Sequence, residues 1–231
     1  MRTLSMTALL AAGVVVGAIG SPVASAQTAC QDLGGVVDAD QVCRVHAEGP
    51  TYQLDFTFPN DYPDPAPVVA YLTQTRDGFV NVAGMPDSYN LPYELDATGT
   101  SYRSGPPDAG TRSLVFTVWQ NVGGVQPQTF FQAFNWDVGK KAPITFDTLF
   151  KPDSDPLEVI YPEVDRYLQN EYGTVVPASP GAGKDPANYQ HFALTDDALI
   201  FFFTQGSLLP DSAGPVQASV PRTVVAPMLA L

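Results

Sequence analysis

The chain has 231 residues, with 24 Asp and Glu against 11 Lys and Arg, a formal net charge of −13 and 45% hydrophobic residues. An acidic surface repels a phosphate backbone, so the composition argues against nucleic acid as a partner. The same charge has two interpretations, which the sequence leaves open: it keeps the protein in solution, or it attracts a basic partner. The length is sufficient for one domain with a sizeable core.

The N-terminus has the pattern of a secretory signal peptide. Arg2 precedes an apolar run over residues 8–19, and Ala24-Ser25-Ala26 stands before Gln27. We therefore predict a signal peptide over residues 1–26 and a secreted domain over residues 27–231, which is extracellular or associated with the cell envelope. Without Arg2 the secreted chain has 10 basic and 24 acidic residues, a net charge of 10 − 24 = −14. No later stretch has the length of a transmembrane helix.

The two cysteines both follow the predicted cleavage site. In an oxidising compartment Cys30 and Cys43 are most simply explained as a disulfide that staples an N-terminal segment over residues 27–50. Their spacing is not that of a C-x-x-C redox motif, and the chain has no His and Cys set with zinc spacing. The sequence predicts neither a metal site nor a bound cofactor.

The first half of the chain predicts a strand followed by a helix. Residues 51–58 alternate between polar and apolar side chains, the period of a strand with one wet face. Pro67 is typical of the first turn of a helix, and apolar residues then recur along one face, at Val68, Leu72, Phe79 and Val82.

Further elements follow with clear turn signals between them. Strand patterns over residues 93–102, 113–122 and 129–136 predict an antiparallel meander, and a helical pattern runs over residues 157–172 despite Pro162. We expect a long loop over residues 173–188, then an aromatic strand over 198–203 and a short one over 216–220. The fold class is therefore predicted as α+β, with a mainly antiparallel sheet and two principal helices.

Several of these segments also resemble a known family. Residues 58–64 (FPNDYPD), 71–79, 119–124 (WQNVGG), 133–137 (AFNWD) and 194–215 follow its pattern in order. The chain is similar to the mycobacterial secreted immunogenic antigens, the MPT/MPB immunogenic proteins, whose domain is shared with the extracellular part of the anti-sigma factor RsiV. The resemblance implies a secreted, partly β-grasp-like α+β domain. It also implies protein binding, as in RsiV, while one branch of the family carries an esterase label.

The residues give a weaker indication of catalysis. A serine esterase needs a nucleophile, a base and an orienting acid, and no serine here has the G-x-S-x-G pattern. His46 is interpreted as a surface or packing residue, so the candidate base is His191. Asp196 and Asp197 follow it closely, and Ser207 and Ser212 lie beyond the next strand, which makes these five residues the candidate site.

Two functions follow from the sequence. The first is an extracellular binding or host-interaction module, whose partner is a host or envelope protein or an acyl ligand. The alternative is a secreted carboxylesterase that acts on short-chain acyl esters. His191 is also explained as a half-buried strand residue and the two aspartates as turn residues, and the sequence leaves this choice open.

Overall fold

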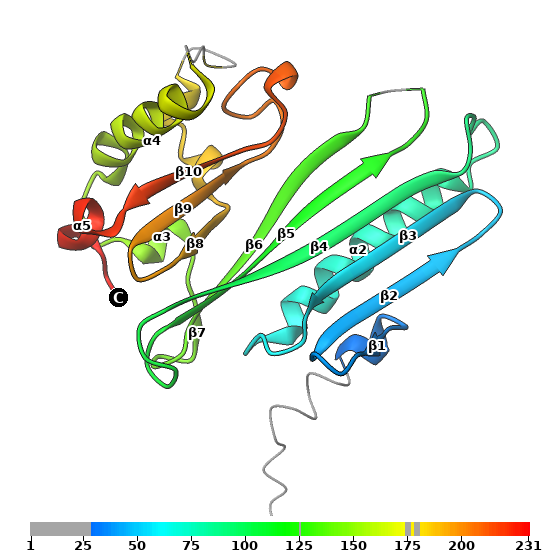
Figure 1. The fold of residues 1–231 in the computed structure, drawn as a ribbon, viewed down its shortest axis with the longest axis horizontal. Coiled ribbons are helices and arrows are strands. Elements are labelled where there is room, and N and C mark those ends of the chain that lie inside the picture. The colour runs from blue at the N-terminus through cyan, green and yellow to red at the C-terminus, as the bar shows by residue number, and fades with distance from the viewer. Residues whose placement is uncertain (1–28, 125, 174–176, 178–180) are drawn as a thin grey trace, which may run out of the picture.

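The computed structural model describes residues 29–124, 126–173, 177 and 181–231, so the predicted signal peptide lies outside the described residues. The chain forms a seven-stranded and a three-stranded sheet (Figure 1). Together with the helices this is an α+β fold with mainly antiparallel pairing, as predicted. Among the described residues, no helix is long and apolar enough to cross a membrane.

The large sheet follows chain order, with every neighbouring pair antiparallel except β3 and β4. These two strands are parallel because the helix α2, Pro65–Ala83, crosses between them. The hairpin β2–β3 with this helix and β4 is the part that resembles a β-grasp. The strands are β1 Val36–Val37, β2 Val42–Glu48, β3 Tyr52–Pro59, β4 Tyr93–Ser104, β5 Thr111–Asn121, β6 Gln128–Asp137 and β7 Ala142–Pro143.

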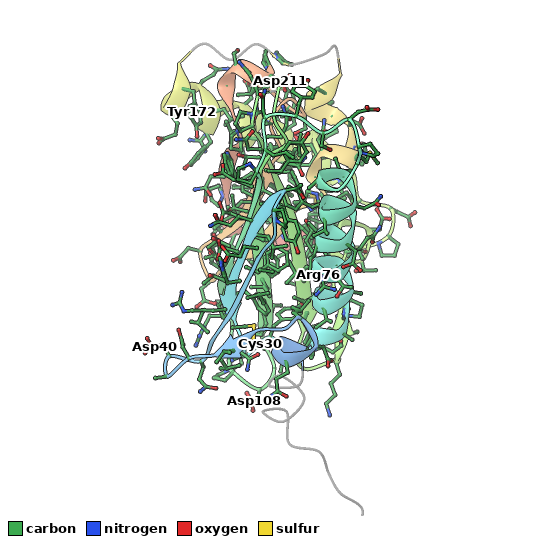
Figure 2. All side chains as sticks on the ribbon, turned by 90° about the vertical axis from the view of Figure 1, so that its right-hand side faces the viewer. Cys30, Asp40, Arg76, Asp108, Tyr172 and Asp211 are labelled. Carbon is green, nitrogen blue, oxygen red and sulfur yellow. A yellow bond between two sulfur atoms is a disulfide. The ribbon has the colours of Figure 1, made fainter. Side chains whose placement is uncertain are left out.

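Helix α2 covers one face of the large sheet and forms a separate layer beside the strands. Figure 2 shows this layer, and Arg76, labelled there, belongs to the helix. Val68, Leu72 and Phe79 of α2 are buried there, as the helical pattern predicts. The prediction for Val82 is wrong: its side chain is 41% exposed, and Ala83 takes the buried position at this end of the helix. In β4, buried residues alternate with exposed ones, so this strand has one covered and one wet face.

The small sheet has its own core. It consists of β8 Phe192–Leu194, β9 Ala198–Phe203 and β10 Val216–Pro221, and the helix α4, Pro156–Tyr172, packs on one of its faces. Helix α4 continues through Pro162 and buries Leu157, Ile160, Val164 and Leu168 of its predicted apolar face. The prediction for Tyr172, the last residue of this face, is wrong, since its side chain is 54% exposed at the end of the helix. The short elements are α3 Phe146–Leu149, η1 Ala182–Lys184, η2 Pro186–Tyr189, η3 Asp211–Ala213, α5 Arg222–Val225 and η4 Ala226–Met228.

Three consecutive phenylalanines of β9 pack into two different hydrophobic cores. Phe201 and Phe203 face α4, whereas Phe202 faces the large sheet, where its ring lies 5.3 Å from that of Phe131. A hydrogen bond also joins the two sheets, because Asn135 Nδ2 on β6 donates to the Phe192 carbonyl of β8 at 2.9 Å. The small sheet therefore packs on the side of the large sheet that α2 leaves free.

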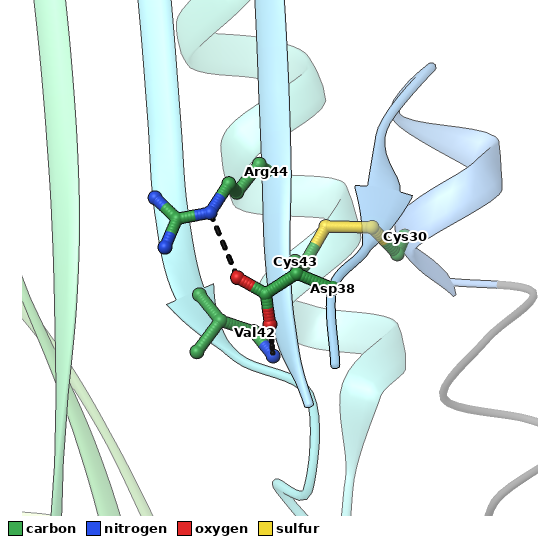
Figure 3. Close-up of a disulfide and its surroundings, with 5 residues drawn as sticks. All are labelled: Cys30, Asp38, Val42, Cys43 and Arg44. Atoms are coloured by element: carbon green, nitrogen blue, oxygen red, sulfur yellow. Dashed lines mark hydrogen bonds and ion pairs between the residues drawn. A yellow bond between two sulfur atoms is a disulfide. The ribbon is translucent and has the colours of Figure 1, made fainter. Parts of the chain in front are cut away.

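The predicted disulfide joins Cys30 to Cys43 on β2, and both cysteines are fully buried (Figure 3). Beside it, Asp38 accepts hydrogen bonds from Arg44 Nε at 2.8 Å and from the backbone N–H of Val42 at 3.0 Å. These contacts hold the residues after the predicted cleavage site against the edge of the large sheet.

Removing the disulfide is expected to destabilise the fold. It closes a loop with a sequence separation of 13, so on the chain-entropy model the Cys30→Ser/Cys43→Ser variant loses about 3 kcal/mol of unfolding free energy. For a domain of this size Tm then falls by roughly 6–12 °C, measurable by circular dichroism. The references are wild-type protein with its disulfide intact and wild-type protein whose disulfide has been reduced. A variant that melts with the oxidised wild type would contradict this expectation.

Candidate functional site

The side of the large sheet opposite α2 is open over β2, β3, β4 and the adjoining end of β5. We call this surface the open face and define it by six side chains that are exposed or half-exposed. They are His46, Glu48, Asp55, Glu94, Asp96 and Trp119. The strand alternation that buries their neighbours under α2 turns these side chains to the opposite side.

Four of these residues form one row across four strands. The register pairs His46 with Asp55, Asp55 with Asp96, and Asp96 with Trp119. Directly paired residues have Cβ atoms about 4.5–5.5 Å apart, so adjacent members of the row are within contact distance. The row thus joins two pairs of consecutive strands, β2–β3 and β4–β5, which α2 separates in the sequence, and the backbone of the sheet holds it together.

The row concentrates negative charge around one imidazole. His46 Nδ1 lies 2.7 Å from Asp55 Oδ1, and His46 Nε2 lies 3.9 Å from Glu48 Oε2. The hydrogen bond to Asp55 raises the pKa of His46 above its usual value. Partial burial, and then the charges of Asp55 and Glu94, raise the pKa of Asp96. A cation placed here would relieve the repulsion between these carboxylates.

The structure places the predicted base, His191, just before β8. Its carbonyl accepts a hydrogen bond from the Phe202 N–H at 2.9 Å. The side chain is half-buried, and its Nδ1 is buried with no hydrogen-bond partner. Burial lowers the pKa of His191, so the imidazole is neutral at pH 7.

The two predicted serines lie beyond β9, at the same end of the small sheet as His191. Ser207 Oγ donates to the Thr204 carbonyl at 2.7 Å. Ser212 is exposed in η3 and follows Asp211, which lies at the end of the molecule opposite Cys30 (Figure 2). Within the described residues, neither serine is hydrogen-bonded to His191.

The predicted acids lie at the other end of the same hairpin. Asp196 and Asp197 form the turn between β8 and β9, about 16 Å along β9 from the position of His191. Asp196 Oδ1 accepts the Gly105 N–H at 2.7 Å, and the Asp197 carbonyl accepts the Arg222 N–H at 2.7 Å. The structure therefore brings the serines to the same end as His191 and holds the aspartates away from it.

The histidine–carboxylate pair of this fold is His46 with Asp55, which sequence reasoning did not single out. The signal was present in the alternation of residues 42–48, which forms β2 beside the predicted strand β3. Around this pair the open face offers threonine hydroxyls, at Thr57 and Thr98, whereas Ser104, on the same side of β4, is buried and accepts a hydrogen bond from Arg222. The pair is therefore suited to binding and charge pairing.

The two histidines are expected to titrate on opposite sides of pH 6.5. In NMR-monitored titration, His46 should deprotonate above this value and His191 below it. The Asp55→Asn variant should bring the His46 pKa down towards 6.5 and leave that of His191 unchanged. The stabilisation from the His46 pair is full below pH 6.5 and is lost as the pH rises through the raised pKa. If both rings titrated at the same pH, the His46–Asp55 hydrogen bond and the burial of His191 would be contradicted.

The fold has solved relatives at low sequence identity. A DUF3298 family protein from Pseudomonas aeruginosa PAO1 superposes with a TM-score of 0.55 at 15% identity, covering 84% of this chain and 95% of that one. A DUF3298 family member from Bacteroides fragilis NCTC 9343 gives 0.53 at 14% identity, covering 82% and 92%. The family model described as a protein of unknown function (DUF3298) matches residues 147–223, which contain α4 and the small sheet.

Curated relatives match along the whole chain. Esterase Rv3036c of Mycobacterium tuberculosis is 50% identical over 228 residues, 99% of both chains. Immunogenic protein MPB64 of Mycobacterium bovis is 42% identical over 222 residues, 96% of this chain and 97% of that protein. Immunogenic protein MPT64 of Mycobacterium tuberculosis matches to the same extent. The chain therefore belongs to the family of the mycobacterial immunogenic proteins MPB64 and MPT64 and the esterase Rv3036c.

Proposed function

We propose that this protein is a secreted binding protein, which recognises an extracellular protein partner with a basic surface through the open face. The observation that carries the proposal is the row from His46 to Trp119, exposed on a sheet face that no other layer of the described residues covers. Strands hold these side chains at fixed spacing, so binding requires little ordering of the surface.

The charge of the chain favours a basic partner. With a predicted net charge of −14 after cleavage, the protein attracts cationic molecules over distances longer than a direct contact. On the open face, Asp55 and Asp96 offer carboxylates to lysine or arginine. Trp119, half-exposed beside Asp96, offers a ring face on which a guanidinium can stack.

The extracellular location rests on separate observations. The predicted signal peptide, the disulfide between Cys30 and Cys43, and the kinship with immunogenic proteins all fit a protein that leaves the cytoplasm. The partner is then a protein of the host or of the cell envelope.

Binding to an oligolysine peptide tests the open face. We expect the Asp55→Asn/Asp96→Asn variant to bind the peptide several-fold more weakly than wild type at low salt, because it removes two carboxylates from the row. The matched control is Asp108→Asn/Glu171→Gln, which removes two exposed carboxylates elsewhere. Calorimetric titration at two salt concentrations measures both. Equal weakening by the two variants would show that only net charge matters and would exclude the open face.

The alternative function, a carboxylesterase, is favoured by one finding: the 50% identical relative is named an esterase. Its candidate residues in this chain are His191 as base and Ser207 or Ser212 as nucleophile, with Asp196 or Asp197 as the acid. For such a mechanism the hairpin would have to rearrange, because the aspartates lie at its far end.

Ester hydrolysis separates the two functions. With a short-chain chromogenic ester, we expect His191→Ala, Ser207→Ala and Ser212→Ala to hydrolyse at the wild-type rate, because no catalytic hydrogen bond joins these residues. The His46→Ala variant is also measured, because His46 is hydrogen-bonded to the Asp55 carboxylate. Circular dichroism checks that each variant is folded. Loss of a substantial wild-type rate in one folded variant would establish the esterase.

A further inference from the structure

A groove runs between α2 and the β5–β6 hairpin, on the side of the large sheet opposite the open face. It has a volume of about 540 Å³, within the range of small-molecule sites. We call it the α2 groove. It is lined by Tyr71, Gly78 and Val82 of α2 and by Gln120, Val122 and Phe130 of the hairpin.

Gly78 keeps the groove open. A glycine inside a helix costs about 1 kcal/mol relative to alanine, and close packing does not require one here. A Cβ added at Gly78 would meet no atom within 4 Å, because the position faces the open groove. A larger residue at this position would support the helix better and would fill the groove. The sequence thus keeps a less favourable residue where a side chain would occupy the cavity.

The groove is electrically neutral. None of its lining residues is charged, in a chain where charged residues make up 15%. Its polar groups are amides and hydroxyls, and among these the Tyr71 hydroxyl is itself buried, beside Thr75. The chemistry therefore matches an uncharged ligand that is mostly apolar and carries a polar head group for the side chains of Gln74, Thr75 and Gln120.

An exposed apolar strip continues from the groove. Among the described residues, seven large apolar side chains are strongly exposed, and four of them lie at the end of α2 and in the loop that follows. They are Val82 at 41%, Met85 at 50%, Tyr89 at 60% and Leu91 at 38% exposure. Tyr89 lies against Gly123 and Gly124 in the β5–β6 turn, next to Val122. The strip extends the apolar surface available to a long ligand.

We propose that the α2 groove binds a single acyl chain that is joined to an uncharged head group, as in a monoacylglycerol. Four of the nine lining residues are polar but uncharged, so an acyl chain can lie along the apolar residues while an uncharged head group bonds to amides and hydroxyls. The site goes beyond the proposed protein-binding function, since it lies on the other face of the sheet and uses none of the open-face residues.

The Gly78→Leu variant tests the groove. Monolauroylglycerol, used as monomer below its critical micelle concentration, should displace a fluorescent naphthylamine probe from the full secreted chain. The leucine side chain occupies part of the groove, so we expect binding at least about tenfold weaker. Tm should not fall, because leucine is the better helix former.

The matched control is Ala70→Leu, which adds leucine at an exposed position of α2 outside the groove. It should bind like wild type. Equal binding by the Gly78 variant, or no binding by wild type, would overturn the proposal. Binding to lipid vesicles without binding to the monomer would also overturn it, because the apolar strip would then be a membrane contact. The Asp55→Asn/Asp96→Asn variant should keep full acyl binding, which separates this site from the open face.

Discussion

The fold depends on how the faces of the large sheet are divided between two covering layers. Helix α2 covers one face, and the small sheet packs through Phe202 against Val115 and Phe131 on the other. Strands β4, β5 and β6 are 12, 11 and 10 residues long, so they extend past the region that the small sheet covers. Where the two layers overlap, residues 113–116 of β5 are buried on both faces, whereas Thr117 and Trp119 further along the strand are exposed or half-exposed on the side opposite α2.

This division explains the position of both candidate sites. Where the small sheet ends, the alternation of the strands leaves polar side chains facing solvent, and these form the open face. On the opposite side, α2 does not reach across to β6 along its whole length, and Phe130 remains half-exposed at the groove. Each site is therefore an uncovered part of a core layer, held by regular backbone, with the scaffold fixing its shape.

Local patterns predicted much of this fold and little of the site. The alternation of residues 51–58, the turn signals of the meander and the apolar stripe of α4 each depend on near neighbours, and the structure has these elements. Strand β8 has only three residues and gives no periodic signal, so the second sheet was not predicted. Val82 was misplaced because helical period alone does not tell how far a sheet extends beneath a helix.

The site depends on pairing between distant strands, which the sequence does not show. His46, Asp55 and Asp96 belong to three separate strands, and only the register places them in one row. Residues that are close in the sequence can also lie far apart in the structure. Asp196 lies five residues after His191, yet the two are at opposite ends of the β8–β9 hairpin, because an extended strand moves the chain about 3.3 Å with each residue.

The two candidate sites share strands and are nevertheless chemically separate. Trp119 and Gln120 are consecutive in β5, but the pleat turns Trp119 to the open face and Gln120 to the groove. One side is acidic and aromatic, while the other is neutral and mostly apolar, with the core of the large sheet between them. Substitutions on opposite faces share no direct contacts, so their effects should add.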